Sequence, residues 1–152
     1  MKIGFIGCGN MGSAMLQGIL EAGTYKAEEL IASAKSEKTN EKIKNEFKIT
    51  LADSNQDVVR MADFVFLAVK PQYYEQIITE IKGVTRSGQV FVSIAPGKSL
   101  KWLEECFGKE LKLVRAMPNT PAMVREGMTA YCVNERIEMQ EKAQIAEICG
   151  YF

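Results

Sequence analysis

Hydrophobic and polar residues form two kinds of pattern that follow one another in turn along the chain. Short apolar runs rich in β-branched and aromatic residues predict strands, and longer stretches with apolar residues at helical spacing predict helices. Strands are expected at residues 3–6, 30–33, 47–51, 64–69, 90–94 and 111–116. Helices are expected at residues 11–20, 36–45, 57–61, 72–81 and 100–107. This alternation predicts a doubly wound α/β fold, in which helices cover both faces of a mostly parallel sheet with strand order 3-2-1-4-5-6.

The last part of the chain predicts an addition to the edge of that sheet. Residues 128–133 have the pattern of a strand, which we expect to be antiparallel, and residues 138–149 predict an amphipathic helix. Tyr151 and Phe152 follow the helix-stopping Gly150 and predict the beginning of a further strand. The chain has 152 residues and no linker-like segment, so we expect one domain over residues 1–152.

The first predicted strand runs into the sequence GCGNMG at residues 7–12, which has the spacing G-x-G-x-x-G. At this spacing Gly7 allows a tight turn, Gly9 lets the backbone approach a pyrophosphate, and Gly12 lets the helix pack close on the strand. The amino terminus of the helix that follows attracts anions. The turn therefore predicts a dinucleotide site on a Rossmann-type domain. The alternative is a glycine-rich turn that binds nothing.

The end of the second predicted strand indicates which dinucleotide is preferred. An NAD site usually has an acidic residue here to bind the ribose 2′-hydroxyl, whereas a 2′-phosphate needs a cation and small polar groups. The sequence at this point is Ser33, Ala34, Lys35 and Ser36, without an acid. Lys35 and the hydroxyls therefore favour NADP(H) over NAD(H), unless Lys35 is an ordinary surface lysine. Asn55 is expected on the adenine side of the cofactor.

Four apolar strands end in small residues, proline or glycine, which let a flat ring approach the backbone. Open α/β sheets bind ligands in the crevice outside the carboxyl ends of their strands. The segments expected there are residues 68–71 after the fourth strand, 95–97 after the fifth and 117–121 after the sixth.

Charge and composition exclude several other classes of function. The chain has 19 basic and 19 acidic residues, so it lacks the electrostatic footprint of a nucleic-acid or membrane-surface protein. No segment reaches the roughly 18 consecutive apolar residues of a membrane span. Met1 and Lys2 lead directly into the first strand without a signal-peptide pattern. We therefore expect a cytoplasmic protein.

Histidine is absent from the chain, which removes the commonest general acid or base and the commonest metal ligand. The four cysteines, Cys8, Cys106, Cys132 and Cys149, form no C-x-x-C pair, so we expect neither a zinc site nor a redox motif. Cys8 lies in the glycine turn, where a reactive role is improbable. The other three are expected to be packed thiols.

Several motifs together resemble the pyrroline-5-carboxylate reductase family. They are FIGCGNMG at residues 5–12, FLAVKPQ at 66–72, VSIAPG at 92–97 and RAMPNTPAMVREG at 115–127. They span most of the chain in the family's order. The glycine motif is shared with β-hydroxyacid dehydrogenases, whereas the MPNTP segment is much more specific.

The resemblance implies NADPH as the cofactor, with NADH binding more weakly. No catalytic residue is assigned, although Asn119 and Thr120 are expected near the nicotinamide end. Together with the cleft residues predicted above, the resemblance gives the expected cofactor-binding set, which is Ile6, Gly7, Cys8, Gly9, Asn10, Met11, Gly12, Ser33, Ala34, Lys35, Ser36, Asn55, Ala68, Val69, Lys70, Pro71, Ile94, Ala95 and Asn119.

The implied reaction is hydride transfer to the C=N carbon of 1-pyrroline-5-carboxylate, which gives L-proline. A protonated imine is already electrophilic, so the lack of histidine is no obstacle. Family members continue with a helical domain that forms the homo-oligomer and binds the substrate carboxylate, and that domain is expected to be absent from these 152 residues. The alternatives are a non-catalytic dinucleotide-binding regulatory module and a β-hydroxyacid-dehydrogenase-like oxidoreductase.

Overall fold

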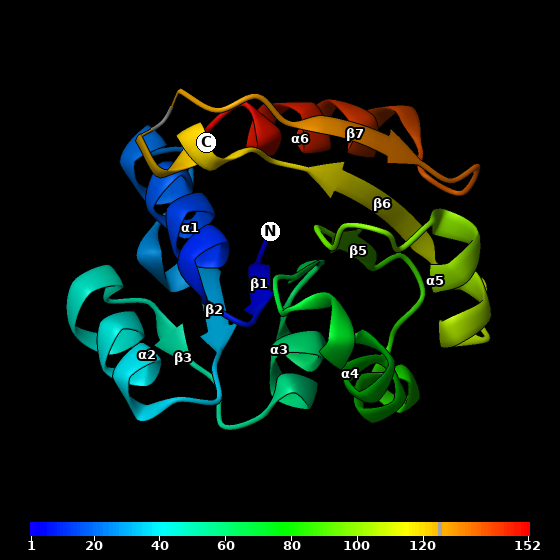
Figure 1. Ribbon diagram of the computed structural model, residues 1–152, viewed down its shortest axis with the longest axis horizontal. Helices are drawn as coiled ribbons and strands as arrows, with labels where there is room; N and C mark the ends of the chain where they lie inside the picture. The colour runs from blue at the N-terminus through cyan, green and yellow to red at the C-terminus, as the bar shows by residue number, and fades with distance from the viewer. Residues whose placement is uncertain (125) are drawn as a thin grey trace.

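The computed structural model describes residues 1–124 and 126–152, apart from the side chains of residues 120 and 123. Within this part of the chain, seven strands form one sheet in the order β3-β2-β1-β4-β5-β6-β7 (Figure 1). The strands are β1 (Ile3–Ile6), β2 (Leu30–Ser33), β3 (Thr50–Leu51), β4 (Phe64–Leu67), β5 (Val90–Ser93), β6 (Lys112–Met117) and β7 (Ala130–Val133). All neighbours pair in parallel except β6 and β7, which are antiparallel. The predicted fold class and strand order are confirmed.

Helices cover both faces of the sheet. They are α1 (Asn10–Ala22), α2 (Glu37–Lys42), α3 (Asn55–Met61), α4 (Tyr74–Ile81), α5 (Leu100–Phe107) and α6 (Met139–Cys149). Short helical turns are η1 (Ala27–Glu29), η2 (Ile43–Phe47), η3 (Pro71–Tyr73), η4 (Lys82–Val84) and η5 (Thr120–Val124). Apolar residues of α1 and α6 share one core cluster, and those of α3, α4 and α5 share the other. No helix in the described residues is long and apolar enough to cross a membrane.

The central strands are buried on both faces, which explains their continuous apolar sequences. Successive side chains of β4 point to opposite faces. Phe66 therefore stacks on Phe5 of β1, with ring centroids 4.8 Å apart, in the cluster beneath α1. Val65 and Leu67 belong to the cluster beneath α3 and α4. Because their side chains pack into both clusters, β1 and β4 are held from both faces of the sheet.

The third predicted strand was wrong at its start. Phe47 ends the helical turn η2 instead of opening the strand, and the strand begins at Thr50. The reason is local, since Ile43 and Phe47 both point into the core from one helical face. Lys48 then takes a left-handed conformation, with φ of 55°, and ends the helix.

The further strand predicted at Tyr151 and Phe152 is also wrong. Tyr151 lies in a turn, and its N–H donates to the Ile148 carbonyl at 3.2 Å. Its hydroxyl donates to Glu147 at 2.6 Å and accepts from the Thr24 hydroxyl at 2.8 Å. Phe152 is buried in the cluster beneath α1. Phe152 is therefore buried and Tyr151 is partly buried without either residue joining the sheet.

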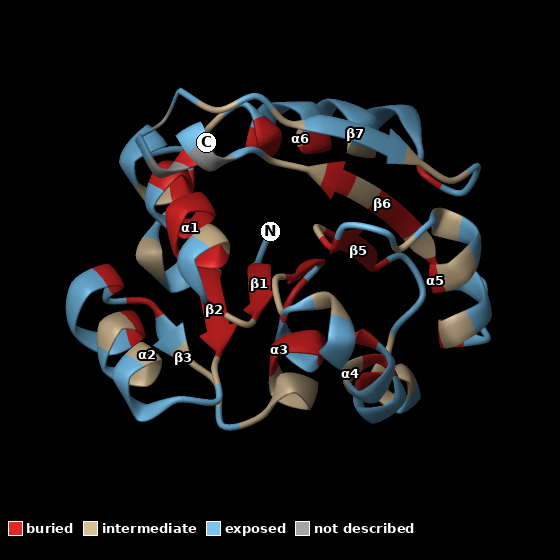
Figure 2. Cartoon of the chain, in the orientation of Figure 1, coloured by how far each residue is buried: buried red, intermediate tan, exposed pale blue. Residues whose placement is uncertain are grey.

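The thiols are less packed than predicted. All four cysteines are free, and Cys149 is buried as expected. Cys106 is only half-buried and Cys132 is exposed. Cys132 lies on β7, the exposed strand at the edge of the sheet (Figure 2). An edge strand has a neighbour on one side only, so an apolar sequence there does not imply burial.

Candidate functional site

The three glycines of the turn between β1 and α1 have different geometries. Gly7 has φ of 89°, a left-handed conformation that favours glycine, and a Cβ there would lie 2.9 Å from the Ala68 carbonyl oxygen. A Cβ at Gly12 would lie 2.9 Å from the Gly7 oxygen and 3.1 Å from the Ala68 Cβ. A Cβ at Gly9 would meet no described atom within 4 Å. Gly7 and Gly12 are therefore required by the fold, whereas Gly9 keeps a space open.

That space lies at the amino terminus of α1. Gly9 is the N-cap residue and has no side-chain cap, and the fully described first turn of α1 carries no acidic side chain. The turn is fixed from behind, because Ser13 donates through its hydroxyl to the Cys8 carbonyl at 3.0 Å and through its N–H to the Gly9 carbonyl at 2.9 Å. The amides of a first helical turn lack partners inside the helix and carry partial positive charge. An anion can therefore be bound here by the backbone alone.

The turn opens on a cleft of about 580 Å³ at the carboxyl ends of the parallel strands. The end of β2, the start of α3, the end of β4 and one face of α4 form its other walls. The predicted site residues that the structure brings together there are Gly7, Cys8, Gly9, Ser33, Ala34, Lys35, Ser36, Asn55, Ala68, Val69 and Lys70.

The other predicted residues lie around this cleft without lining it. Ile6 is fully buried in β1, and Met11 and Gly12 are in the first turn of α1. Asn10 lines a neighbouring hollow between the glycine turn and α2. The remaining ones are Pro71 at the start of η3, Ile94 and Ala95 after β5, and Asn119 after β6. The side chain of Thr120 lies outside the described part of the chain.

Asn119 has a local structural contact. Its Oδ1 accepts a hydrogen bond of 2.8 Å from the N–H of Met128. This bond ties the segment after β6 to the segment before β7. Asn119 therefore shapes the loop at the carboxyl end of β6, the end expected to face the nicotinamide.

The loop after β2 offers one unpaired cation. Lys35 is exposed, lines the cleft and forms no ion pair with any residue that the structure describes. The hydroxyls beside it are engaged: Ser33 donates to Asn55 Oδ1 at 2.7 Å, and Ser36 accepts from the N–H of Thr39 at 3.2 Å as the N-cap of α2. Sequence reasoning had left both hydroxyls available to a phosphate. In the structure, the positive charge of Lys35 is the main free feature of this loop.

Sequence reasoning missed one wall of the cleft. Tyr73, Gln76, Ile77 and Glu80 line it from η3 and α4. Glu80 also accepts a hydrogen bond of 3.0 Å from Asn55 Nδ2, which joins α4 to α3 across the cleft. The spacing i, i+3, i+4, i+7 places these residues on one helical face. Their mixed polarity could have identified them, because a purely structural helix face buries apolar residues. Thr39, Ala52, Asp53 and Ser54 were missed as well.

Burial keeps the thiol in the glycine turn uncharged. It raises the pKa of Cys8 to about 12, an effect that the positive charge of Lys42 only partly opposes. Cys8 is 4% exposed. A thiol with this pKa is protonated at neutral pH and a poor nucleophile. The turn therefore presents no negative charge of its own to an incoming phosphate.

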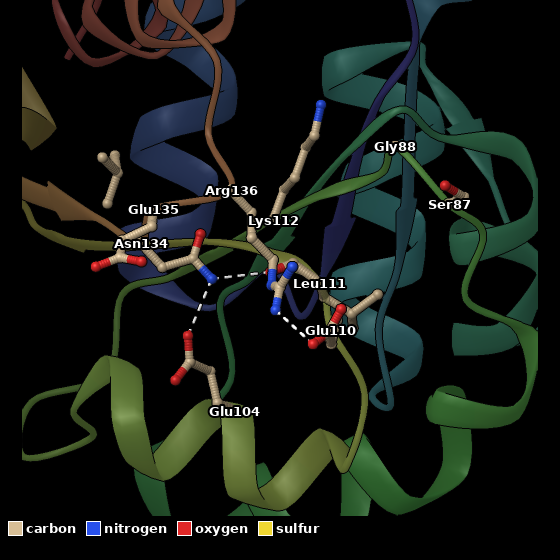
Figure 3. Close-up of a pocket in the computed structure, with 10 residues that line it drawn as sticks. Ser87, Gly88, Glu104, Glu110, Leu111, Lys112, Asn134, Glu135 and Arg136 are labelled. Carbon is tan, nitrogen blue, oxygen red and sulfur yellow. Dashed lines mark hydrogen bonds and ion pairs between the residues drawn. The ribbon is translucent and has the colours of Figure 1, made fainter.

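A larger hollow, of about 970 Å³, lies at the other end of the strands, by the amino ends of β5 and β6 (Figure 3). Both of its basic side chains are in ion pairs: Arg136 pairs with Glu110 at 2.8 Å, and Lys112 pairs at 2.8 Å with Glu138, the N-cap residue of α6. Asn134 donates to Glu104 at 3.1 Å and to the Leu111 carbonyl at 2.9 Å. Because these polar groups already have partners, size alone does not make this hollow the functional site.

Comparison with known proteins agrees with this geometry. The family model described as NADP oxidoreductase coenzyme F420-dependent matches residues 2–97. The chain is 37% identical to pyrroline-5-carboxylate reductase from Escherichia coli (strain K12), over 99% of the chain and 56% of that relative. It therefore spans about half the length of the curated relatives it matches.

Solved structures give the same result. A pyrroline-5-carboxylate reductase from Coxiella burnetii matches with a TM-score of 0.94 and 30% identity, over 99% of this chain and 56% of that one. The pyrroline carboxylate reductase of Plasmodium falciparum with NADP bound matches with a TM-score of 0.89 and 34% identity, over 99% and 55%. The resemblance drawn from the sequence motifs is confirmed. The chain belongs to the family described as NADP oxidoreductase coenzyme F420-dependent.

Proposed function

We propose that this chain binds NADPH in the cleft at the carboxyl ends of its strands and is the cofactor-binding domain of a pyrroline-5-carboxylate reductase. The observation that carries the proposal is the open space at Gly9. This space lies at the amino terminus of α1, and Gly9 lines the same cleft as Lys35, which forms no ion pair with a described residue. This donor set fits a dinucleotide with a 2′-phosphate. The NADP named in the family model and in the Plasmodium structure supports the same cofactor.

The residues of the chain have separate roles in this proposal. The backbone of residues 7–12 binds the pyrophosphate, with Gly9 giving it access. Lys35 pairs with the 2′-phosphate, and Asn55, held by Ser33 and Glu80, borders the adenosine half. The segments 68–71 and 94–95 and Asn119 border the nicotinamide half. Asn10, Met11 and Gly12 complete the helix terminus, and Ile6 supports the turn from within the sheet.

Bound NADPH supplies a hydride to the C=N carbon of protonated 1-pyrroline-5-carboxylate, so that the C=N bond is reduced to the C–N bond of L-proline. The chain's part is to hold the cofactor and leave one face of its ring accessible. Within residues 1–152 we assign no group that binds the substrate carboxylate. We propose that a helical part of the catalytic unit, through which the protein forms a homo-oligomer, provides it. The span of about half of each relative supports this division.

The proposed setting is the cytoplasm, with a small-molecule substrate and with neither nucleic acid nor membrane as a partner. The equal numbers of basic and acidic residues, 19 of each, support it. The regulatory-module alternative is less favoured, because the relatives that match nearly the whole chain are named as reductases.

A chimera tests the reductase assignment. Residues 1–152 would replace the matching part of the Escherichia coli relative, and proline formation from 1-pyrroline-5-carboxylate would be measured with NADPH. We expect proline at a rate well above that of a matched chimera carrying Gly9→Val. A chimera that binds NADPH but forms no proline would contradict the substrate assignment. Absence of NADPH binding by the chain itself would contradict the cofactor assignment.

A further inference from the structure

The hydroxyl of Tyr74 joins the carboxyl ends of two neighbouring strands. Tyr74 opens α4, and its side chain is fully buried. Its hydroxyl donates to the carbonyl of Leu67, the last residue of β4. The same oxygen accepts from the N–H of Ile94, directly after β5, and from the Ser93 hydroxyl, both at 3.3 Å. One side-chain oxygen therefore contacts both strand ends.

These contacts continue the sheet where its ladder stops. Leu67 and Ser93 are the last paired residues of β4 and β5. Beyond them the two backbones separate, and their polar groups need other partners. The Ser93 hydroxyl also accepts from the N–H of Ala95 at 3.4 Å. Tyr74 and Ser93 thus satisfy the last carbonyl of β4 and the first two N–H groups after β5.

The two segments that leave this point are those placed around the nicotinamide half. A dinucleotide lies across the crevice at the switch point of the strand order, with one half on each side. In this sheet β1, β2 and β3 lie on one side of that point, and β4, β5 and β6 lie on the other. Gly7, Lys35 and Asn55 follow or face the first group of strands. The connection made by Tyr74 lies entirely within the second group.

We propose that Tyr74 is a positioning residue that sets the separation of residues 68–71 from residues 94–95 and thereby the placement of the nicotinamide ring. This inference rests on the proposed function. Tyr74 touches the strand ends and not the cofactor itself, because it is buried beneath the cleft that Tyr73 lines.

Packing alone does not require the hydroxyl. The Tyr74 ring fills the cluster beneath α3, α4 and α5, a place that phenylalanine would also fill. Burial raises the pKa of Tyr74 to about 12, so the hydroxyl is protonated at neutral pH and can donate to Leu67. Tyr74→Phe therefore removes the connection between the strands while keeping the ring. Ser93→Ala leaves the bonds of Tyr74 to Leu67 and Ile94 in place and removes the two hydrogen bonds of the Ser93 hydroxyl, to Tyr74 and to the Ala95 N–H.

The test compares two ligands on the 152-residue chain. NADPH occupies the whole cleft, whereas adenosine 2′,5′-bisphosphate has no nicotinamide half. We expect Tyr74→Phe to weaken NADPH about three- to tenfold, the range for net loss of one or two hydrogen bonds. The adenosine bisphosphate should change less than about twofold on the same grounds. Ser93→Ala should shift NADPH in the same direction by less.

Tyr151→Phe is the matched control. It also removes a hydroxyl with two partners, Thr24 and Glu147, but after the last helix. It should change neither affinity. Equal weakening of both ligands by Tyr74→Phe would overturn the inference in favour of a general structural role, and so would no change in either. If the wild-type chain bound the adenosine bisphosphate but not NADPH, the proposed function and this inference would both fail.

Discussion

The two ends of the sheet hold hollows that differ in size and in the state of their polar groups. In the amino-end hollow, of about 970 Å³, both basic side chains, Lys112 and Arg136, are held in ion pairs. The carboxyl-end cleft is smaller, about 580 Å³, but it contains a glycine turn, an uncapped helix terminus and the unpaired Lys35. Volume alone would therefore place the functional site at the amino ends of the strands, whereas the polar groups without partners place it at the carboxyl ends.

The difference follows from the connectivity of the fold. Chains that leave parallel strands at their carboxyl ends turn away in opposite directions at the switch point, which leaves a crevice with exposed backbone. At the amino ends of β5 and β6, charged side chains of neighbouring loops are paired. Arg136 and Glu110, for example, fix the loop after β7 to the loop before β6.

Gly9→Val should weaken NADPH binding about a hundredfold or more, which corresponds to a loss of about 2.7 kcal/mol of binding free energy. The reason is steric, because the side chain fills the space left for the pyrophosphate. The fold should survive, since Gly9 has φ of −67° and no described atom lies within 4 Å of the new Cβ. Calorimetric titration and a thermal melt measure the two effects.

Gly83→Val is the matched control for that variant. A Cβ at Gly83 also meets no described atom within 4 Å, but Gly83 lies in η4 and does not line the cleft. It should bind NADPH as the wild type does. A folded Gly9→Val protein with unchanged affinity would exclude the turn as a phosphate site.

Lys35→Ala should weaken the binding of NADPH about tenfold and leave the binding of NADH nearly unchanged. A tenfold change corresponds to the loss of about 1.4 kcal/mol, which we expect for this charge-assisted contact. The lower end of the usual range is expected because Lys35 is exposed and the neighbouring hydroxyls are engaged. Lys35→Asp should lower the preference further, through repulsion of the phosphate and attraction of the ribose diol. Both dissociation constants are measured for each protein at fixed ionic strength. If the wild type and both variants had the same ratio of NADPH to NADH dissociation constants, the role of this loop would be refuted.

The charges at the amino end should affect pH stability instead of binding. Hydrogen bonding to Lys112 lowers the pKa of Glu138, and hydrogen bonding to Glu138 and Glu141 raises the pKa of Lys112. Stability from Glu138 is present above the ordinary glutamate pKa of about 4.3 and is lost as pH falls through the lowered value. Lys112→Met should reduce this acid dependence, measured as the change in the free energy of urea unfolding between about pH 7 and about pH 3. An unchanged dependence would mean that the pair contributes nothing.

Arg136→Ala should have the smallest effect. Its pair with Glu110 is well exposed, with side-chain exposures of 44% and 80%, so the free energy of unfolding should change by less than about 1 kcal/mol. NADPH affinity should not change. A marked loss of affinity would show that the larger hollow takes part in binding after all.

The sequence predicted the fold well where a pattern had a single physical meaning. The apolar runs of β1, β4 and β5 could only be buried strands, and Gly7 and Gly12 marked the turn because a side chain there would collide with the Ala68 segment. The predicted strands at Phe47 and Phe152 were wrong, because an apolar residue indicates burial but not whether a helix, a strand or a turn buries it. The α4 wall of the cleft was missed, because its residues meet the glycine turn only in three dimensions.

The most direct test of the central claim is a chemical-shift map of the backbone amides during titration with NADPH. We expect large shifts at residues 9–12, 34–36, 55 and 68–70, which belong to the glycine turn and the carboxyl-end cleft. We expect no shifts at Gly88, Asn134 and Arg136 in the amino-end hollow. Saturable shifts confined to the amino-end residues, or no shifts at either end, would contradict NADPH binding in the carboxyl-end cleft.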